Sequence, residues 1–223
     1  MAGSKTNRKF KTALRKVFFK NVLPLLLVIG VIQLFANSPI EENVISSLTS
    51  EKKANLSKQV LQYEDKVEKY AKEEGIEDYV PIILALMMQE SGGRGDDPMQ
   101  ASESYCGSVG CINDPEKSIA QGVSYFALTL EKADYNVKLA LQSYNFGAGF
   151  IDYVMNHGGK YTQELAIEFS AMKYEQLQHT GIYSCIREEA LQYDACYGDI
   201  YYVDAVLEYY DEENNENRKV ANF

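Results

Sequence analysis

The chain has 223 residues, enough for one domain of about 150–190 residues plus an appendage, and too few for two catalytic domains. Apolar residues make up 46% and charged residues 24% of the chain, so we expect a packed core and exclude a disordered chain or a fibrous repeat. The net charge is -10, and the seven bases of residues 1–36 leave only 15 bases against 32 acids in the rest. Such an acidic body lacks the basic stripe that a nucleic-acid partner requires.

The first 36 residues predict a membrane segment. Residues 22–36 form an almost unbroken apolar run, and counted from Val17 the stretch has 20 residues, about the length that crosses a bilayer. The bias of positive charge predicts a cytoplasmic N-terminus and an exported body. A cleaved signal peptide is the alternative, although Leu34-Phe35-Ala36 makes a poor cleavage site. The seven bases are Lys5, Arg8, Lys9, Lys11, Arg15, Lys16 and Lys20.

The composition changes four times along the chain and predicts five parts. These are a basic cytoplasmic segment (1–16), a transmembrane signal anchor (17–36), a Ser-containing spacer (37–50), a catalytic domain (51–210) and a charged, Asn-rich flexible tail (211–223). We therefore expect a single-pass protein of the cell membrane whose domain lies outside the cell.

Four cysteines, all after the apolar run, favour disulfides in an oxidising compartment. The local pairs Cys106–Cys111 and Cys185–Cys196 are expected first among the three possible connectivities. The spacings C-x4-C and C-x10-C are not those of zinc ribbons, and the histidines, His157 and His179, are interpreted as bystanders, so no metal site is predicted.

The body is predicted to be mainly α-helical, because apolar residues recur at helical spacing and alternating strand patterns are absent. We expect an amphipathic helix over 51–74 that stops at Gly75, and a helix over 79–90 with Asp78 as N-cap and Pro81 in its first turn. The second of these is apolar on every face between residues 82 and 88, which indicates a buried central helix. Asp114 and Pro115 predict another helix start, and further helices are expected at about 135–144, 148–156, 163–178 and 199–210.

Glu90 stands out because it is a carboxylate at the end of this apolar helix. Ser91-Gly92-Gly93 follows, which ends the helix and is expected to leave backbone open to a ligand. The negative end of the helix dipole and an apolar environment both raise a carboxyl pKa. A protonated glutamic acid is what a general acid needs. The alternative is an ordinary surface Glu near a helix end.

Three blocks of sequence occur in an order and at intervals that resemble the lysozyme-like superfamily. They are Gln89-Glu90-Ser91-Gly92-Gly93, then Asp97-Pro98-Met99-Gln100 with Ser102-Glu103-Ser104, and then Ser143-Tyr144-Asn145-Phe146-Gly147-Ala148-Gly149. Soluble lytic transglycosylases and G-type lysozymes carry related blocks, with Gly-Leu in place of Asp97-Pro98. This departure, the cysteines and the late block Tyr197-Gly198-Asp199-Ile200-Tyr201-Tyr202-Val203 are similar to the CwlT-type lysozyme domain over about residues 50–210.

The resemblance implies a lysozyme-like helical domain around the buried helix, acting as a muramidase on the β-1,4 bond between N-acetylmuramic acid and N-acetylglucosamine. It implies Glu90 as the catalytic acid and Asp97 as the second carboxylate, with Asp96 as a rival. The implied glycan-binding residues are Ser91, Gln100, Ser102, Ser104, Tyr144 and Asn145. For Tyr144 and Asn145 the alternative is that they only brace the helix that carries Glu90. No cofactor is implied.

The resemblance leaves two other functions open. A lytic transglycosylase, which forms 1,6-anhydro ends, needs only the glutamate. A non-catalytic module would bind glycan or scaffold an envelope machine. Relatives on mobile elements make a conjugation or secretion apparatus a candidate partner, besides peptidoglycan and the membrane, and suggest local opening of the wall.

Overall fold

The computed structural model describes residues 56–210, and the predicted cytoplasmic segment, anchor, spacer and tail lie outside this range. The described part is helical and contains no β-strand, as predicted. Within residues 56–210 no helix combines the length and apolar character needed to cross a membrane. The prediction of a transmembrane anchor over 17–36 concerns residues outside the described range.

The first predicted helix is two helices. α4 (Lys58–Gln62) begins at Ser57, whose hydroxyl accepts a hydrogen bond from the Val60 amide. The chain then breaks helical geometry at Tyr63, with φ of -98° and ψ of 0°, and α5 (Glu64–Glu73) continues. The helix does stop at Gly75, which has φ of +72°. The single helix predicted over 51–74 is therefore wrong in its continuity, because a helical pattern of apolar residues does not reveal a break of one residue.

The central helix is confirmed as a buried element. α6 (Val80–Glu90) has seven buried apolar side chains and packs against α5 and α13. Its start differs from the prediction, because Asp78 lies inside a 3-10 turn, η3 (Glu77–Tyr79), which runs directly into the helix. Tyr79 therefore takes the capping position, and Asp78 is not the N-cap. Pro81 does lie in the first turn, as expected.

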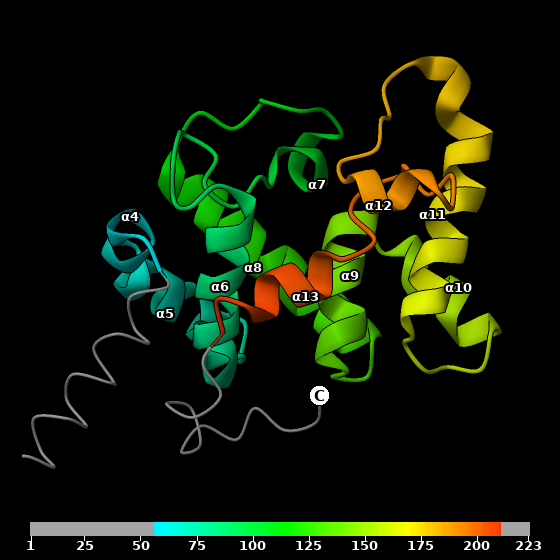
Figure 1. Ribbon diagram of the computed structural model, residues 1–223. Helices are drawn as coiled ribbons and strands as arrows, with labels where there is room; N and C mark the ends of the chain where they lie inside the picture. Colours follow the sequence, from blue (N-terminus) through cyan, green and yellow to red (C-terminus); the bar gives the residue numbers. More distant parts are fainter. Residues whose placement is uncertain (1–55, 211–223) are drawn as a thin grey trace, which may run out of the picture. The chain divides into compact units, whose positions relative to one another are not determined.

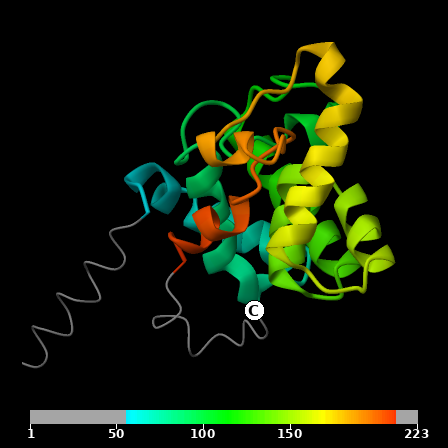
Figure 2. The ribbon, with the colours of Figure 1, turned by 45° about the vertical axis from the view of Figure 1, so that its right-hand side comes forward.

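The remaining helical elements follow along the chain in the order α7 (Ser102–Cys106), α8 (Pro115–Lys132), α9 (Val137–Phe146), α10 (Gly149–Asn156), α11 (Gln163–Leu177), η4 (Gln178–Thr180), α12 (Glu188–Leu191) and α13 (Tyr202–Leu207). Figure 1 shows α13 lying across α6 and α9, which it contacts, while α10 and α11 form the far side of the domain. The same arrangement is visible in Figure 2. Chain segments separated by over a hundred residues thus meet at the end of α6.

Capping residues explain where several helices begin. Asp114 accepts a hydrogen bond from the Glu116 amide at the start of α8, as predicted, and Asn136 and Thr162 do the same for α9 and α11. α7 and α12 were not predicted, because helices of five and four residues carry too little apolar periodicity. α13 is shorter than the helix predicted over 199–210, since residues 199–201 form a turn before it.

Candidate active site

The end of α6 positions Glu90. Ser91 is the C-cap residue, and its amide returns to the carbonyl oxygen of Met87 at 3.1 Å. Gly93 has φ of +78°, and a Cβ there would come within 2.7 Å of the Val60 backbone nitrogen. The glycine pair is buried against neighbouring elements, so the expectation that it leaves backbone open to a ligand is wrong for Gly93. The glycine instead lets α4 pack tightly beside the helix end.

Glu90 is half-buried, and its carboxyl group accepts a hydrogen bond from the hydroxyl of Tyr202, the first residue of α13. Burial raises the pKa of Glu90 to about 7, the Tyr202 hydrogen bond opposes this, and the negative charge of Asp97 adds to the increase. The carboxyl group is therefore largely protonated in mildly acidic solution. A protonated carboxyl of this kind can donate a proton to a leaving oxygen.

Asp97 lies in the loop after α6 and is surrounded by hydrogen-bond donors of its own chain. Its Oδ1 accepts from the Ala101 amide at 2.8 Å and the Ser118 hydroxyl at 2.6 Å. Its Oδ2 accepts from the Ser102 amide at 3.0 Å and the Ser102 hydroxyl at 2.6 Å. Burial raises the pKa of Asp97, but these hydrogen bonds outweigh it, so the pKa lies below its ordinary range.

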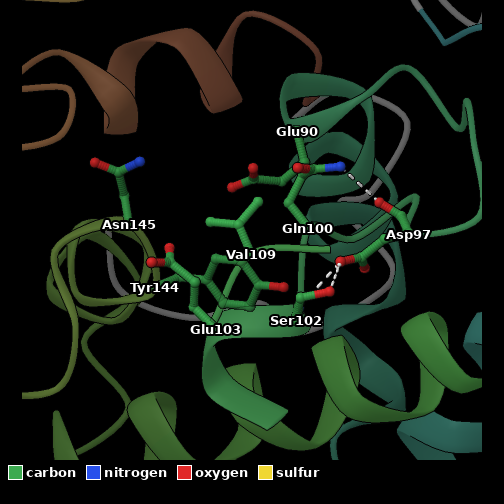
Figure 3. Close-up of a pocket in the computed structure, with 8 residues that line it drawn as sticks. All are labelled: Glu90, Asp97, Gln100, Ser102, Glu103, Val109, Tyr144 and Asn145. Carbon is green, nitrogen blue, oxygen red and sulfur yellow. Dashed lines mark hydrogen bonds between the residues drawn. The ribbon is translucent and has the colours of Figure 1, made fainter. Parts of the chain in front are cut away.

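The two carboxyl groups thus have pKa values shifted in opposite directions. Glu90 is kept protonated to about pH 7, whereas Asp97 is ionised. A pair of titratable groups with separated pKa values is the electrostatic arrangement expected of an acid and an anionic partner. Figure 3 shows both side chains on the same side of the pocket. Its dashed lines mark the hydrogen bonds from Ser102 to the Asp97 carboxylate and from the Gln100 side-chain amide to the Asp97 main-chain carbonyl oxygen.

Close packing beneath the site fixes the loop that carries Asp97. Met99 is fully buried, and a Cβ on Gly122 of α8 would come within 2.5 Å of the Met99 side chain. The hydroxyl of Tyr144 donates to the Met99 carbonyl oxygen at 2.8 Å, and the Met99 amide donates to Ser118 at 3.0 Å. Gly122 therefore has a packing reason, since only glycine allows Met99 so close to α8.

Asn145 connects the site to the late block of sequence. Its side-chain oxygen accepts from the Asp199 amide at 2.8 Å, and Gly198 has φ of +64° beside it. The Asp199 carboxylate pairs with Arg187 at 2.8 Å and accepts from the Tyr201 amide at 2.9 Å. This turn leads directly into α13, so Asn145 helps to fix the position of Tyr202, which contacts Glu90.

The pocket formed by these elements has a volume of about 280 Å3. It brings together six residues predicted from the sequence, Glu90, Asp97, Gln100, Ser102, Tyr144 and Asn145, and adds Glu103 and Val109. Ser91 and Ser104 are not among its lining residues. The Ser91 hydroxyl bonds to the Pro98 carbonyl oxygen at 2.7 Å, and that of Ser104 bonds to the Ala101 carbonyl oxygen at 2.8 Å.

The structure also bears on two alternatives that the sequence leaves open, the choice between Asp96 and Asp97 and the pairing of the cysteines. Asp96 is exposed and does not line the pocket, whereas Asp97 does. The structure has the disulfides Cys106–Cys111 and Cys185–Cys196, which is the pairing expected first. No group of three or more His, Cys, Asp or Glu side chains in residues 56–210 is arranged to hold a metal ion.

The model of the family described as lysozyme-like matches residues 57–210, which covers all but one residue of the described range. The chain belongs to the lysozyme-like family. Within it, the domain is of the CwlT type, since the chain is 46% identical over 142 residues to the bifunctional muramidase/DL-endopeptidase CwlT of Bacillus subtilis (strain 168). This alignment covers 64% of the chain and 39% of CwlT.

Two further relatives support this placement of the lysozyme-like domain. The membrane protein YocA of the same Bacillus subtilis strain is 35% identical over 170 residues, which cover 74% of this chain and 75% of YocA. A crystal structure of a protein similar to a lipoprotein of the NLP/P60 family, from Staphylococcus aureus subsp. aureus Mu50, shares 40% identity with a TM-score of 0.60. That match covers 70% of this chain and 54% of the crystallised one.

The most important residue without a role in the sequence interpretation is Tyr202. It lies 112 residues after Glu90, is 2% exposed, and touches the carboxyl group directly. It belongs to the late block that carries the family resemblance, but its local pattern indicates only a helix with aromatic residues. The spatial pairing becomes visible only when α13 is packed against α6.

Proposed function

We propose that the lysozyme-like domain cleaves the glycan strand of peptidoglycan, as an N-acetylmuramidase acting on the β-1,4 bond between N-acetylmuramic acid and N-acetylglucosamine. The observation that carries the proposal is the half-buried Glu90 carboxyl group beside the ionised Asp97 in one polar pocket. The muramidase named among the relatives supports it.

In this mechanism Glu90 protonates the glycosidic oxygen as the bond to the sugar breaks. Positive charge then develops at the anomeric carbon, and the nearby anionic Asp97 stabilises it electrostatically. Tyr202 holds the Glu90 carboxyl group in one orientation through its hydrogen bond. Gln100 and Asn145 supply polar groups at the pocket surface for the sugar hydroxyl and acetamido groups, while the buried Ser102 holds Asp97 in place.

One observation favours the lytic transglycosylase as a second candidate. An ionised carboxylate has about four acceptor positions, and Asp97 already receives four hydrogen bonds from its own chain. Activation of a water molecule by Asp97 would require one of them to be given up. A transglycosylase avoids this step, because the muramyl 6-hydroxyl attacks in place of water.

We further propose that the protein is tethered to the cell membrane by residues 17–36, with the domain outside the cell. The support is the apolar run preceded by seven bases, and the similarity to a protein named as a membrane protein. A tethered enzyme would cut wall close to the membrane. That would suit local opening of the wall for a transport or conjugation apparatus.

Mass analysis of the products of purified peptidoglycan treated with the full chain tests the reaction. Reducing muramic ends are expected from hydrolysis, and 1,6-anhydro ends would identify the transglycosylase. Glycan strands that stay intact, while the protein binds them, would leave only the non-catalytic module.

A further inference from the structure

The pocket contains one aliphatic side chain that core packing does not explain. Val109 is 79% exposed, yet it lines the same cavity as Glu90 and Asp97. The other lining residues are polar or charged, apart from the aromatic ring of Tyr144. In Figure 3 the Val109 side chain projects among these polar groups rather than into the protein. Single exposed apolar residues are common on protein surfaces, so the place of this one, and not its exposure, is informative.

The chain holds Val109 in a fixed loop. Cys106, the last residue of α7, forms a disulfide with Cys111, and Gly107 and Gly110 have φ of +75° and +76° at the two ends of the short turn between them. Covalent closure of this short turn leaves it fewer conformations than an open loop of the same length. Val109 is therefore presented to the pocket in a preorganised position, which limits the entropy lost on binding.

The same loop is connected to the second carboxylate. The amide of the buried Ile112 donates to the Ser102 hydroxyl at 3.1 Å, and that hydroxyl donates to Asp97 at 2.6 Å. The position of Val109 is thus linked to that of Asp97 through two hydrogen bonds. A ligand group that contacts Val109 would be fixed relative to the reacting bond.

We propose that Val109 is a substrate-contact residue that selects N-acetylated glycan by packing against the methyl of an acetamido group. The inference rests on the proposed glycan substrate. Hydroxyl groups cover most of such a strand. The acetamido methyl is the apolar group that recurs on every sugar. An acetamido methyl is therefore available to Val109 in whichever register the strand binds. Burying one methyl group against an aliphatic side chain contributes about fourfold in affinity.

The test compares two neutral ligands that differ only in this methyl. Peptidoglycan tetrasaccharides are prepared with N-acetyl groups or, after deacetylation and formylation, with N-formyl groups. Their affinities are measured for the full chain carrying Glu90→Gln, which keeps the ligand intact. We expect a preference for the N-acetyl ligand of about fourfold, and a preference below about twofold when Val109→Ser is added.

Leu128→Gln provides the matched control. Leu128 is an exposed apolar residue of α8, 42% exposed, that does not line the pocket. This variant should keep the full preference for the N-acetyl ligand. Neither substitution should change the melting temperature appreciably, because both side chains are exposed. An unchanged preference in Val109→Ser, or none in the parent protein, would overturn the inference.

Cleavage of the N-acetyl tetrasaccharide by the unsubstituted chain is measured separately, so that the two proposals can fail independently. A chain that cleaves the ligand but shows no dependence on Val109 refutes only the contact. A chain that does not cleave it, but loses its N-acetyl preference with Val109→Ser, refutes the enzymatic proposal and supports the contact.

Discussion

The hydroxyl of Tyr202 donates a hydrogen bond to the carboxyl group of Glu90, across 112 residues of sequence. Tyr202 is buried, and the turn before it is fixed by Asn145 and Arg187 through Asp199. The hydrogen bond can persist in both protonation states of Glu90, since the carboxyl group accepts in each. It therefore orients the proposed acid without removing its proton, and moderates the pKa increase that burial causes.

Replacing Glu90 by Gln should lower glycan cleavage by about 100-fold or more, the contribution of a positioned general acid. The substitution keeps size and removes the titrating proton. The matched control is Glu103→Gln, which makes the same change in another carboxyl group of the pocket and should have a much smaller effect. Wild-type turnover by Glu90→Gln would reject the assignment.

The stability of Glu90→Gln gives an independent check on the pKa. The pKa of Glu90 is about 7 in the folded chain and about 4.3 in an unfolded one, so the unfolded state loses its proton first as the pH rises. Glu90 therefore lowers stability progressively between these values, and the loss levels off above pH 7. The melting temperature of Glu90→Gln relative to the native chain should rise across this window.

Tyr202→Phe should move the alkaline limit of activity to higher pH. Activity requires protonated Glu90 and falls as the pH passes the pKa of that group. Removing the Tyr202 hydrogen bond removes an influence that lowers this pKa, so the limit shifts upward while kcat falls because the carboxyl group is less well oriented. Tyr201→Phe, at the neighbouring residue, should leave the profile unchanged. A loss of activity in Tyr202→Phe without any shift would indicate a purely structural role.

The tether is tested by fractionation with an antibody against the domain. Seven bases before the apolar run and no acid should keep residues 1–16 in the cytoplasm, so full-length protein is expected in membranes. Protease added to wall-stripped cells should degrade the domain. A shortened soluble form that begins near Asn37 would show instead that the apolar run is a cleaved signal.

Each disulfide should stabilise the folded chain by about 2–3 kcal/mol, because it lowers the conformational entropy of the unfolded state. Cys185–Cys196 closes the longer loop, so replacing both of its cysteines by Ser should lower stability slightly more than the same change at Cys106–Cys111. Activity should fall more when Cys106 and Cys111 are replaced, because this shorter loop carries Val109 and adjoins Ser102. Chemical denaturation and turnover measured on the two double variants would show whether the variant that loses more stability is also the one that loses more activity.

The sequence predicts those parts of the site that depend on local pattern. An apolar helix that ends in Glu90 followed by Ser91 and two glycines indicates this carboxylate, whereas the role of Asp97 is implied only by the family resemblance. Tyr202 has no such signal, since its contact with Glu90 depends on how α13 packs against α6. The position of Asp78 also failed as a prediction, because a short 3-10 turn before a helix displaces the cap and leaves no periodic trace.

Asp97 both lines the pocket and accepts four hydrogen bonds. Asp97→Asn leaves a single acceptor oxygen and turns an amide group toward donors, so stability should fall by about 1–3 kcal/mol. The pKa of Asp97 is lowered by folding, so the stability it contributes is present above its unfolded pKa of about 3.9 and is lost as the pH falls through the folded value. The difference in stability between the native chain and Asp97→Asn should therefore shrink below about pH 4.

Ser118→Ala separates the two roles of Asp97, because Ser118 is buried, does not line the pocket, and donates one of the four hydrogen bonds. If the charge of Asp97 stabilises the transition state, Asp97→Asn should lose at least about tenfold more activity than Ser118→Ala, which keeps that charge. Asp96→Asn, at the exposed neighbour, should leave both stability and turnover unchanged. Equal losses in Asp97→Asn and Ser118→Ala would mean that Asp97 only organises the loop, and would favour the transglycosylase, which needs Glu90 alone.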